Sequence, residues 1–389
     1  MKGNTDGLEF TLGRIPEIQF GIGRSRSIAG DAAALCEAGK PVALVADGPL
    51  VALGLAAPVV EALEQSGAAV CLFDGIDGEP KQAQMEAAAD FVRAGDAGLV
   101  ICLGGGSAMD IGKVAATVAR TGRSPADFAM DGDPLPKDSL PKICLPTTAG
   151  TGSELSSTNI FTSNAGKKNW VWGPETKPDL VILDPNLTLT LPPHLTAWTG
   201  LDAFAHALES CTNARRHAAN DVYAHQALGL IAGALETAVR EPDNIGARGD
   251  MLLGSAYAGI AIDNCSTGMA HNISHAIAAL GPMHHGLATG LGLEVVLGWQ
   301  VEEDDGAFAA AAAACGLARD GTALVDWYSD FITRCGVERK LPETLKPYGA
   351  ADLALEMKAP DTQYMRQIVT RTVGDDDIDR FAAAMMAMV

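Results

Sequence analysis

Short apolar runs alternate with amphipathic segments along the first 190 residues of the chain. The runs at 41–47 (PVALVAD), 69–75 (AVCLFDG), 98–106 (GLVICLGGG) and 142–148 (KICLPTT) have the length and composition of buried strands. The segments between them, 49–67, 81–95 and 107–120, carry the spaced apolar residues of helices. Strands that alternate with helices at this spacing predict a parallel, doubly wound sheet. Ahead of the first run, residues 8–13 and 17–23 are expected to pair as a hairpin.

The pattern changes after the Pro- and Thr-rich stretch VILDPNLTLTLPPHLTAW, which ends at residue 198. The segments at 201–211, 221–241 and 248–262 show helical spacing with few β-branched runs, and no repeat recurs at a fixed period. We therefore predict an α/β fold with two domains. Residues 1–190 form a domain with a doubly wound parallel sheet, and residues 191–389 form an all-α domain.

Composition narrows the range of partners and compartments. A net charge of -20 argues against nucleic acid and anionic membranes as partners. The N-terminus has no apolar signal region, and no apolar run approaches the roughly 18 residues of a membrane span, so a cytoplasmic protein is expected. The eight cysteines form no C-x-x-C pair and are scattered through apolar segments. They are predicted to be reduced thiols, neither disulfides nor metal ligands.

The stretch ICLGGGSAMDIGK joins a predicted strand to a predicted helix through three glycines. Gly105 and Gly106 allow a ligand to approach the backbone, and Ser107 begins a helix whose N-terminus attracts phosphate. A tight turn would also use glycine, and the stretch is neither G-x-G-x-x-G nor a Walker A loop. Asp47 ends an earlier strand, where a carboxylate can accept hydrogen bonds from a ribose, although an ordinary Asp-Gly turn is the alternative.

A second loop follows the strand at 142–148. Its sequence, PTTAGTGSE, supplies the hydroxyl groups of Thr147, Thr148 and Thr151 beside a strand end. Together with the glycine turn it predicts a dinucleotide laid across the carboxyl ends of the strands. Asp110, in the helix after the glycines, is included among the expected cofactor-binding residues.

Histidines gather between residues 268 and 290, which hold four of the eight in the chain. His271 and His275 share a helical face, and His285 follows a Gly-Pro break; a pair of surface histidines is the alternative interpretation. Asp202 and His206 are again four residues apart. The two pairs and His285 offer one oxygen and up to four nitrogens, a set suited to Fe²⁺ or Zn²⁺ but too rich in nitrogen for Ca²⁺ or Mg²⁺.

These motifs, in this order, resemble the iron-containing (group III) alcohol dehydrogenase family. The resemblance extends from FGIG at 20–23 to about residue 300, and its most specific parts are GGGSAMDIGK, LPTTAGTGSE, VILDPNLTLTLPPHLTAWTGLDAFAHALES and the H…H…HG block. It implies four metal ligands, Asp202, His206, His271 and His285. His275 is implied to lie near substrate and nicotinamide as a catalytic residue that does not bind the metal.

In the first domain the resemblance implies cofactor contacts at Asp47, Gly105, Gly106, Ser107, Thr147 and Thr148, with Lys168 near the cofactor ribose. Two departures are visible. Glu79-Pro80-Lys81 stands where the family often has Asn-Pro-Thr, which removes an amide that touches the cofactor. After His285, Thr289 and Glu294 replace an Asn and a Pro, and Glu294 is expected near the wall of the active site, where it would tune substrate choice. His284 has no family counterpart.

The implied activity is reversible hydride transfer between a small primary alcohol and nicotinamide, with Fe²⁺ or Zn²⁺ as Lewis acid and NAD expected rather than NADP. A small alcohol or aldehyde is the expected partner, and the protein is expected to form a homodimer or larger homo-oligomer. The alternatives are a glycerol dehydrogenase-like or maleylacetate reductase-like enzyme, a dehydroquinate synthase-like lyase, and a protein that binds metal or nucleotide without turnover.

Overall fold

A computed structural model describes residues 9–130 and 132–389 of the chain, which divides into two compact units. One unit comprises residues 14–190, and the other comprises the helical part from residue 191 onward. Residues 9–13, which the sequence prediction assigned to the first domain, group with the helical unit. The amide of Gly13 donates a 2.9 Å hydrogen bond to Asn264 Oδ1, and the ring of Phe10 stacks on His217 with centroids 4.4 Å apart.

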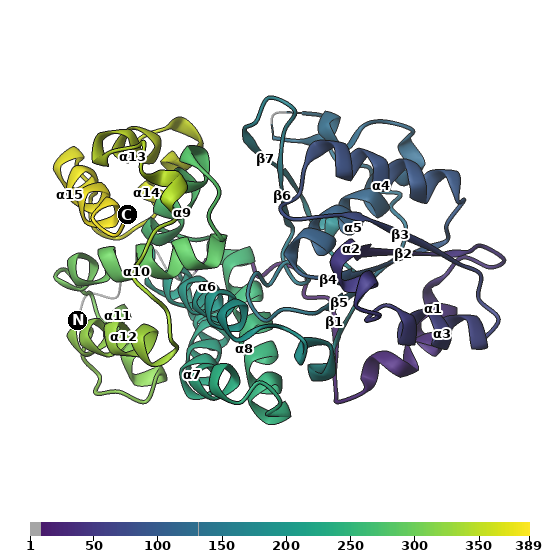
Figure 1. Ribbon diagram of the computed structural model, residues 1–389, viewed down its shortest axis with the longest axis horizontal. Coiled ribbons are helices and arrows are strands. Elements are labelled where there is room, and N and C mark those ends of the chain that lie inside the picture. Colours follow the sequence, from purple (N-terminus) through teal and green to yellow (C-terminus); the bar gives the residue numbers. More distant parts are fainter. Residues whose placement is uncertain (1–8, 131) are drawn as a thin grey trace. The chain divides into compact units, whose positions relative to one another are not determined.

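A six-stranded parallel sheet forms the centre of the first unit (Figure 1). The strand order is β1-β8-β5-β4-β2-β3. The bounds are β1 Glu17–Phe20, β2 Val42–Asp47, β3 Val70–Ile76, β4 Leu99–Gly104, β5 Lys142–Pro146 and β8 Leu180–Leu183. The predicted strands and the predicted parallel arrangement are thus confirmed. Because β3 and β4 lie on opposite sides of β2, the order of connection reverses between β2 and β4, which is where ligands bind in open α/β sheets.

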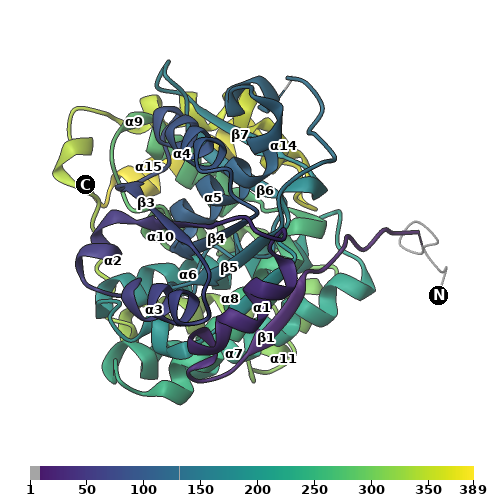
Figure 2. The same cartoon turned by 90° about the vertical axis from the view of Figure 1, so that its right-hand side faces the viewer.

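Helices cover both faces of this sheet, as Figure 2 shows with α1 and α3 on one side and α4 and α5 on the other. Their bounds are α1 Ile28–Leu35, α3 Ala57–Gln65, α4 Gln82–Ala94 and α5 Gly106–Val118, and the short α2 spans Gly48–Ala52. Alternate strand residues such as Leu44 and Ile101 pack against Ile28 and Leu63 to form one buried cluster. On the opposite face, Gly112 of α5 packs directly on Cys102 and Val45. Both faces are buried, which is why these strands are continuously apolar.

The hairpin predicted for residues 8–13 and 17–23 is wrong. In the structure, β1 pairs in parallel with β8, with Glu17 opposite Leu180, and residues 9–13 form no strand. A hairpin does occur later in the unit, where β6 (Thr158–Thr162) pairs antiparallel with β7 (Lys168–Trp172). The sequence analysis did not identify this hairpin, because both strands are short and mix polar with aromatic residues.

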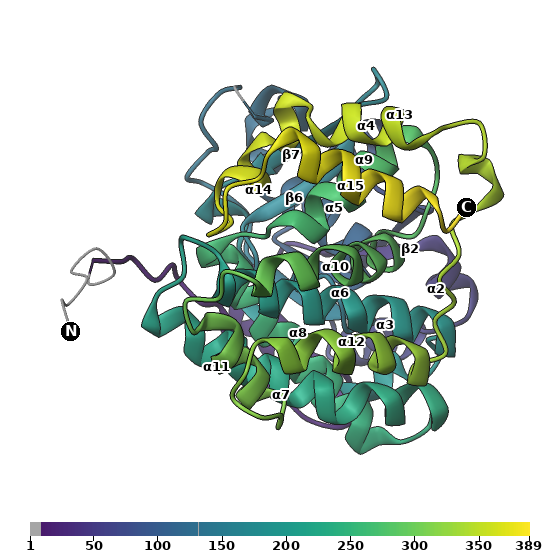
Figure 3. The same ribbon diagram turned by 90° about the vertical axis from the view of Figure 1, so that its left-hand side faces the viewer.

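The second unit is helical, with α6 packed against α7, α8 and α10 (Figure 3). The long helices are α6 Pro193–Thr212, α7 Ala218–Arg240, α8 Ile245–Cys265, α9 Met269–Leu280 and α10 His285–Val301. The remainder are α11 Ala307–Ala314, α12 Thr322–Arg334, α13 Ala350–Met357, α14 Gln363–Gln367 and α15 Asp375–Met386. The predicted fold class is therefore confirmed. All eight cysteines are free thiols, as expected. Within residues 9–130 and 132–389, no helix has both the length and the apolar character needed to cross a membrane.

Candidate metal centre and cofactor-binding turn

Three helices of the second unit bring the predicted metal ligands together. Asp202 and His206 lie one turn apart on α6, His271 lies in the first turn of α9, and His285 is the first residue of α10. Gly281 ends α9 and Pro282 follows it, so the chain turns before His285. Gly286 lets α10 approach α6, because a Cβ there would lie 2.3 Å from the carbonyl oxygen of Trp198.

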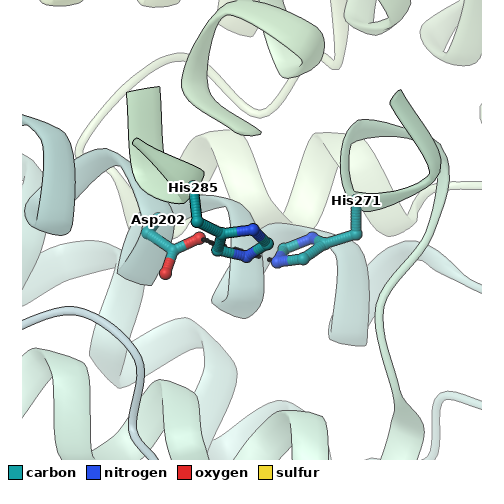
Figure 4. A group of neighbouring side chains, drawn as sticks. All are labelled: Asp202, His271 and His285. Carbon is teal, nitrogen blue, oxygen red and sulfur yellow. Dashed lines mark ion pairs between the residues drawn. The ribbon is translucent and has the colours of Figure 1, made fainter. Parts of the chain in front are cut away.

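The carboxylate of Asp202 is the centre of the group (Figure 4). Its Oδ1 lies 3.6 Å from Nε2 of His271, 3.6 Å from Nε2 of His285 and 3.9 Å from Nε2 of His206. Ligand atoms bound at about 2.0–2.2 Å to a tetrahedral ion lie about 3.3–3.6 Å apart. The spacing of Asp202, His271 and His285 matches this value, and His206 lies slightly beyond it.

Burial makes this arrangement costly unless a cation is bound. The side chains of Asp202, His206 and His271 are 3%, 6% and 3% exposed, whereas that of His285 is 33% exposed. Asp202 Oδ1 and His271 Nε2 are both buried without a hydrogen-bond partner. Two buried acceptors 3.6 Å apart need a positive charge between them, so the residues fit a divalent ion.

The pKa values of Asp202 and His271 also indicate that this site favours a positive charge. Burial opposes the charge of Asp202, but the imidazoles of His206, His285 and His271 hold the pKa of its carboxyl well below the usual range. Burial lowers the pKa of His206 to about 4, so this ring is neutral and able to bind a metal. Burial also disfavours protonated His271, yet the carboxylates of Glu209 and Asp202 raise its pKa to about 9. A proton and a metal ion therefore compete for this nitrogen.

Two residues that the sequence analysis missed orient the imidazoles. Glu209 Oε2 accepts a 2.6 Å hydrogen bond from Nδ1 of His271, and Ser274 Oγ lies 2.8 Å from Nδ1 of His285. Glu209 follows Asp202 by seven residues and so shares its helical face, which was the available sequence signal. Ser274 lies three residues after His271 and offered no comparable signal.

The other histidines nearby take different positions. The ring centroid of His275 lies 5.7 Å from that of His285, and the ring of His284 lies 5.1 Å from Trp198. In the described parts of the chain, the group whose atoms are close enough to share an ion consists of Asp202, His271 and His285, without His206, His275 or His284.

Glu294 is held by another side chain of the helical unit. Arg339 donates from both Nε and Nη2 to the carboxylate of Glu294, at 2.7–3.0 Å, and also binds the carbonyl oxygen of Ser329. The Glu294 side chain is 16% exposed. The ion pair holds Glu294 in place, and an effect of this residue on substrate choice stays a prediction.

The glycine turn of the first unit lies at the junction of β2 and β4. Asp47 Oδ2, at the end of β2, accepts a 2.9 Å hydrogen bond from the amide of Gly105. Burial raises the pKa of this carboxyl, and the bond from Gly105 opposes the rise. Gly104 adopts φ +150°, and a Cβ there would lie 2.2 Å from Asp47 Oδ2. Asp47 therefore shapes the turn, in addition to any contact with a ribose.

The loop 146–154 packs over the same turn. The amide of Thr147 bonds to the carbonyl of Gly104 at 2.9 Å, and a Cβ on Gly106 would lie 2.8 Å from Thr151 Cγ2. Thr148 is the nearest neighbour of Gly105, at 3.4 Å from the position of a Cβ there. The structure thus brings the predicted threonines and glycines together, with Ser107 in the first turn of α5.

Two residues expected to bind the cofactor are tied to protein groups. Asp110 accepts hydrogen bonds from the hydroxyl of Ser153 and, at 2.9 Å, from the amide of Ile160. It thereby anchors loop 146–154 and β6 to α5. Lys168 forms an ion pair with Glu79, the residue that replaces the family asparagine.

Comparison with known proteins gives the family of both units. Residues 16–185 match the model for iron-containing alcohol dehydrogenases, and residues 196–364 match the model for the C-terminal part of that family. The chain is 31% identical to long-chain-alcohol dehydrogenase 1 of Geobacillus thermodenitrificans, over 86% of this chain and 85% of that protein. It is 34% identical to the sulfoacetaldehyde reductase of Bilophila wadsworthia, over 70% of each.

Solved structures agree with these matches. The sulfoacetaldehyde reductase of Bifidobacterium kashiwanohense, crystallised in complex with NAD⁺, superposes with a TM-score of 0.89 at 29% identity, covering 98% of this chain and 100% of that chain. A 1,3-propanediol oxidoreductase superposes with a TM-score of 0.87 at 25% identity, covering 97% of this chain and 100% of the other. The related proteins are dehydrogenases and reductases, which favours the oxidoreductase prediction over the lyase alternative.

Proposed function

The chain belongs to the iron-containing alcohol dehydrogenase family and is an oxidoreductase, and on this premise we propose that it interconverts a small primary alcohol and its aldehyde with NAD. The oxidation converts alcohol and NAD⁺ into aldehyde, NADH and a proton. The observation that carries the proposal is the convergence of Nε2 of His271 and Nε2 of His285 on Asp202 Oδ1, each at 3.6 Å. Asp202 Oδ1 and His271 Nε2 are buried without a hydrogen-bond partner.

Asp202, His206, His271 and His285 would hold the divalent ion. When bound, such an ion acts as a Lewis acid on the oxygen of the substrate and favours loss of the hydroxyl proton. His285, the most exposed of the four, marks the side of the site that solvent and substrate reach. His275, whose ring lies beside that of His285, is the proposed residue to carry the proton toward solvent.

The β4–α5 turn would hold the cofactor. Gly105 is the N-cap of α5 and Gly106 is the first of its thirteen residues. The N-terminal N–H groups and the dipole of this helix favour the diphosphate. Asp47 ends the neighbouring strand, and its negative charge favours NAD over NADP, which carries an additional phosphate on the ribose. Thr147, Thr148 and Thr151 supply hydroxyl groups on the loop that covers the turn.

The substrate we propose is a small polar aldehyde or alcohol. Support comes from the sulfoacetaldehyde reductases and propanediol oxidoreductase among the similar proteins, and from the imidazole rings of His275 and His284 in the same helical unit as the metal centre. A glycerol dehydrogenase-like or maleylacetate reductase-like activity would use the same residues on a different polar substrate.

One assay tests this function. Absorbance at 340 nm is followed with a panel of short, long, neutral and anionic aldehydes, using NADH or NADPH and added Fe²⁺, Zn²⁺ or chelator. We expect turnover of small polar aldehydes with NADH that chelator abolishes. The proposal would be contradicted if no aldehyde were turned over. It would also be contradicted if the rate of turnover stayed the same after chelator had removed all metal from the protein.

A further inference from the structure

The carboxylate of Glu209 bonds to two groups at the start of α9. Its Oε2 accepts from Nδ1 of His271 and its Oε1 accepts from the amide of Ala270, both at 2.6 Å. The residue is 2% exposed, and the absence of a side chain at Gly268 leaves room for it, since a Cβ there would lie 3.1 Å from Oε1. Both oxygens of this carboxylate therefore accept hydrogen bonds, which hold it in one orientation beside the His271 ring.

This contact decides which nitrogen of His271 faces the metal centre. Because Oε2 is an acceptor, the proton of a neutral His271 ring is held on Nδ1, and the lone pair is held on Nε2. Nε2 is the atom that lies 3.6 Å from Asp202 Oδ1.

His285 has a different partner. Its Nδ1 lies 2.8 Å from the hydroxyl of Ser274, which is neutral and can donate or accept, and its side chain is 33% exposed. A neutral hydroxyl orients the ring more weakly than a buried carboxylate does. His271 and His285 are therefore oriented by different kinds of group.

We infer that Glu209 is the positioning residue of the metal centre: it fixes the tautomer of His271 so that the lone pair of Nε2 faces the divalent ion. The inference rests on the proposed metal centre and deepens it. Glu209 acts through His271, because it contacts Nδ1 of that ring, while Nε2 on the other side of the ring faces Asp202.

The test measures ion binding rather than turnover. Wild-type protein, Glu209→Gln and the control Ser274→Ala are loaded with Co²⁺, and their affinities are measured by competition with a chromogenic chelator. Glu209→Gln keeps the size of the side chain but presents an N–H₂ group to one of the two donors. We expect it to weaken Co²⁺ binding by about 10- to 100-fold and to change the visible Co²⁺ spectrum. Ser274→Ala should weaken binding less than Glu209→Gln does.

A double-mutant cycle identifies the route of the effect. In the His271→Gln background, Glu209→Gln should cause little further loss of Co²⁺ affinity, because the residue through which it acts is gone. Equal losses in both backgrounds would mean that Glu209 acts by charge or folding alone and would overturn the positioning role, as would a folded Glu209→Gln with an affinity within twofold of wild type.

If Glu209→Gln does not fold, Glu209→Asp takes its place. The shorter side chain keeps the charge but cannot reach both Ala270 and His271, so at least threefold weaker binding is expected, and wild-type affinity would overturn the inference. A wild-type protein that binds no divalent ion would instead refute the proposed metal centre itself, which keeps the two failures distinct.

Discussion

Gly105→Ala is expected to leave the fold intact while damaging cofactor binding. The two neighbouring glycines are explained by contacts within the protein, because a Cβ on Gly104 would meet Asp47 and a Cβ on Gly106 would meet Thr151. Gly105 has no such explanation. Its backbone angles, φ -80° and ψ -167°, are open to any residue, and the nearest atom to a Cβ there is Thr148 Cγ2 at 3.4 Å. The remaining reason for glycine at this position is a ligand that approaches closely.

The size of the effect follows from these contacts. A methyl group at ordinary van der Waals distance adds no strain, and replacing glycine reduces the entropy of the unfolded chain, so stability should change by less than about 1 kcal/mol. A methyl group forced into the contact between backbone and diphosphate costs about 1–3 kcal/mol, as overpacking does elsewhere. Since each 1.4 kcal/mol is a factor of ten, the affinity for NAD should fall by about 5- to 150-fold.

Two controls separate strain from ligand contact. Gly104→Ala combines φ +150° with a Cβ 2.2 Å from Asp47 Oδ2, and should lower both the melting temperature and NAD affinity. Gly122→Ala, at φ +68° with no atom within 4 Å of its Cβ, measures strain alone and should leave NAD binding unchanged. For each variant, the affinity for NADH is measured by fluorescence titration and the melting temperature by thermal denaturation. A Gly105→Ala protein that binds NAD as tightly as wild type would refute the assignment of the diphosphate to the β4–α5 turn.

Three further results are expected. His285→Ala should lose bound metal and activity together while His284→Ala keeps both metal and fold, as measured by elemental analysis; the reverse would move the ligand to His284. His275→Ala should hold its metal but change the pH–rate profile, and loss of metal from this variant would make His275 a ligand. Glu154 is buried with one unpartnered oxygen, and burial raises its pKa from 4.5 to about 7. The folded state therefore holds the proton more tightly than the unfolded state, so stability is present below pH 4.5 and falls as pH rises through 7, by roughly 3 kcal/mol. Urea denaturation at pH 5.5 and 8.5 should show Glu154→Gln gaining more stability relative to wild type at pH 8.5 than at pH 5.5, and parallel behaviour of the two proteins would contradict this.

The local pattern of apolar residues was sufficient to predict most strands of the first unit. Buried parallel strands are apolar on both faces, so 41–47, 98–106 and 142–148 were recognisable without any knowledge of their neighbours. The β6–β7 hairpin was not, because both strands are short and mix polar with aromatic residues. The pairing of β1 was also misjudged, since its partner β8 lies about 160 residues further along the chain.

The candidate site divides in the same way. Spacing by four residues placed Asp202 and His206 on one helical face. The helix break at Gly281 and Pro282 indicated that the chain turns and can bring a following histidine back to the same site. Spacing did not distinguish His284 from His285; the structure does, because His285 Nε2 faces Asp202 while the ring of His284 lies beside Trp198.

Contacts between distant segments decided what the remaining charged residues do. Glu294 was expected near the wall of the active site, and the structure adds an ion pair with Arg339, 45 residues away. Asp110 was expected to bind cofactor, and its oxygens hold Ser153 and Ile160. The sequence by itself determined the class of fold and which residues can ligate a metal, because hydrophobic period and helical spacing are local properties. Only the tertiary structure decided that Glu209 orients His271, 62 residues away, because a buried carboxylate takes its role from whichever donors the packing of helices brings to it.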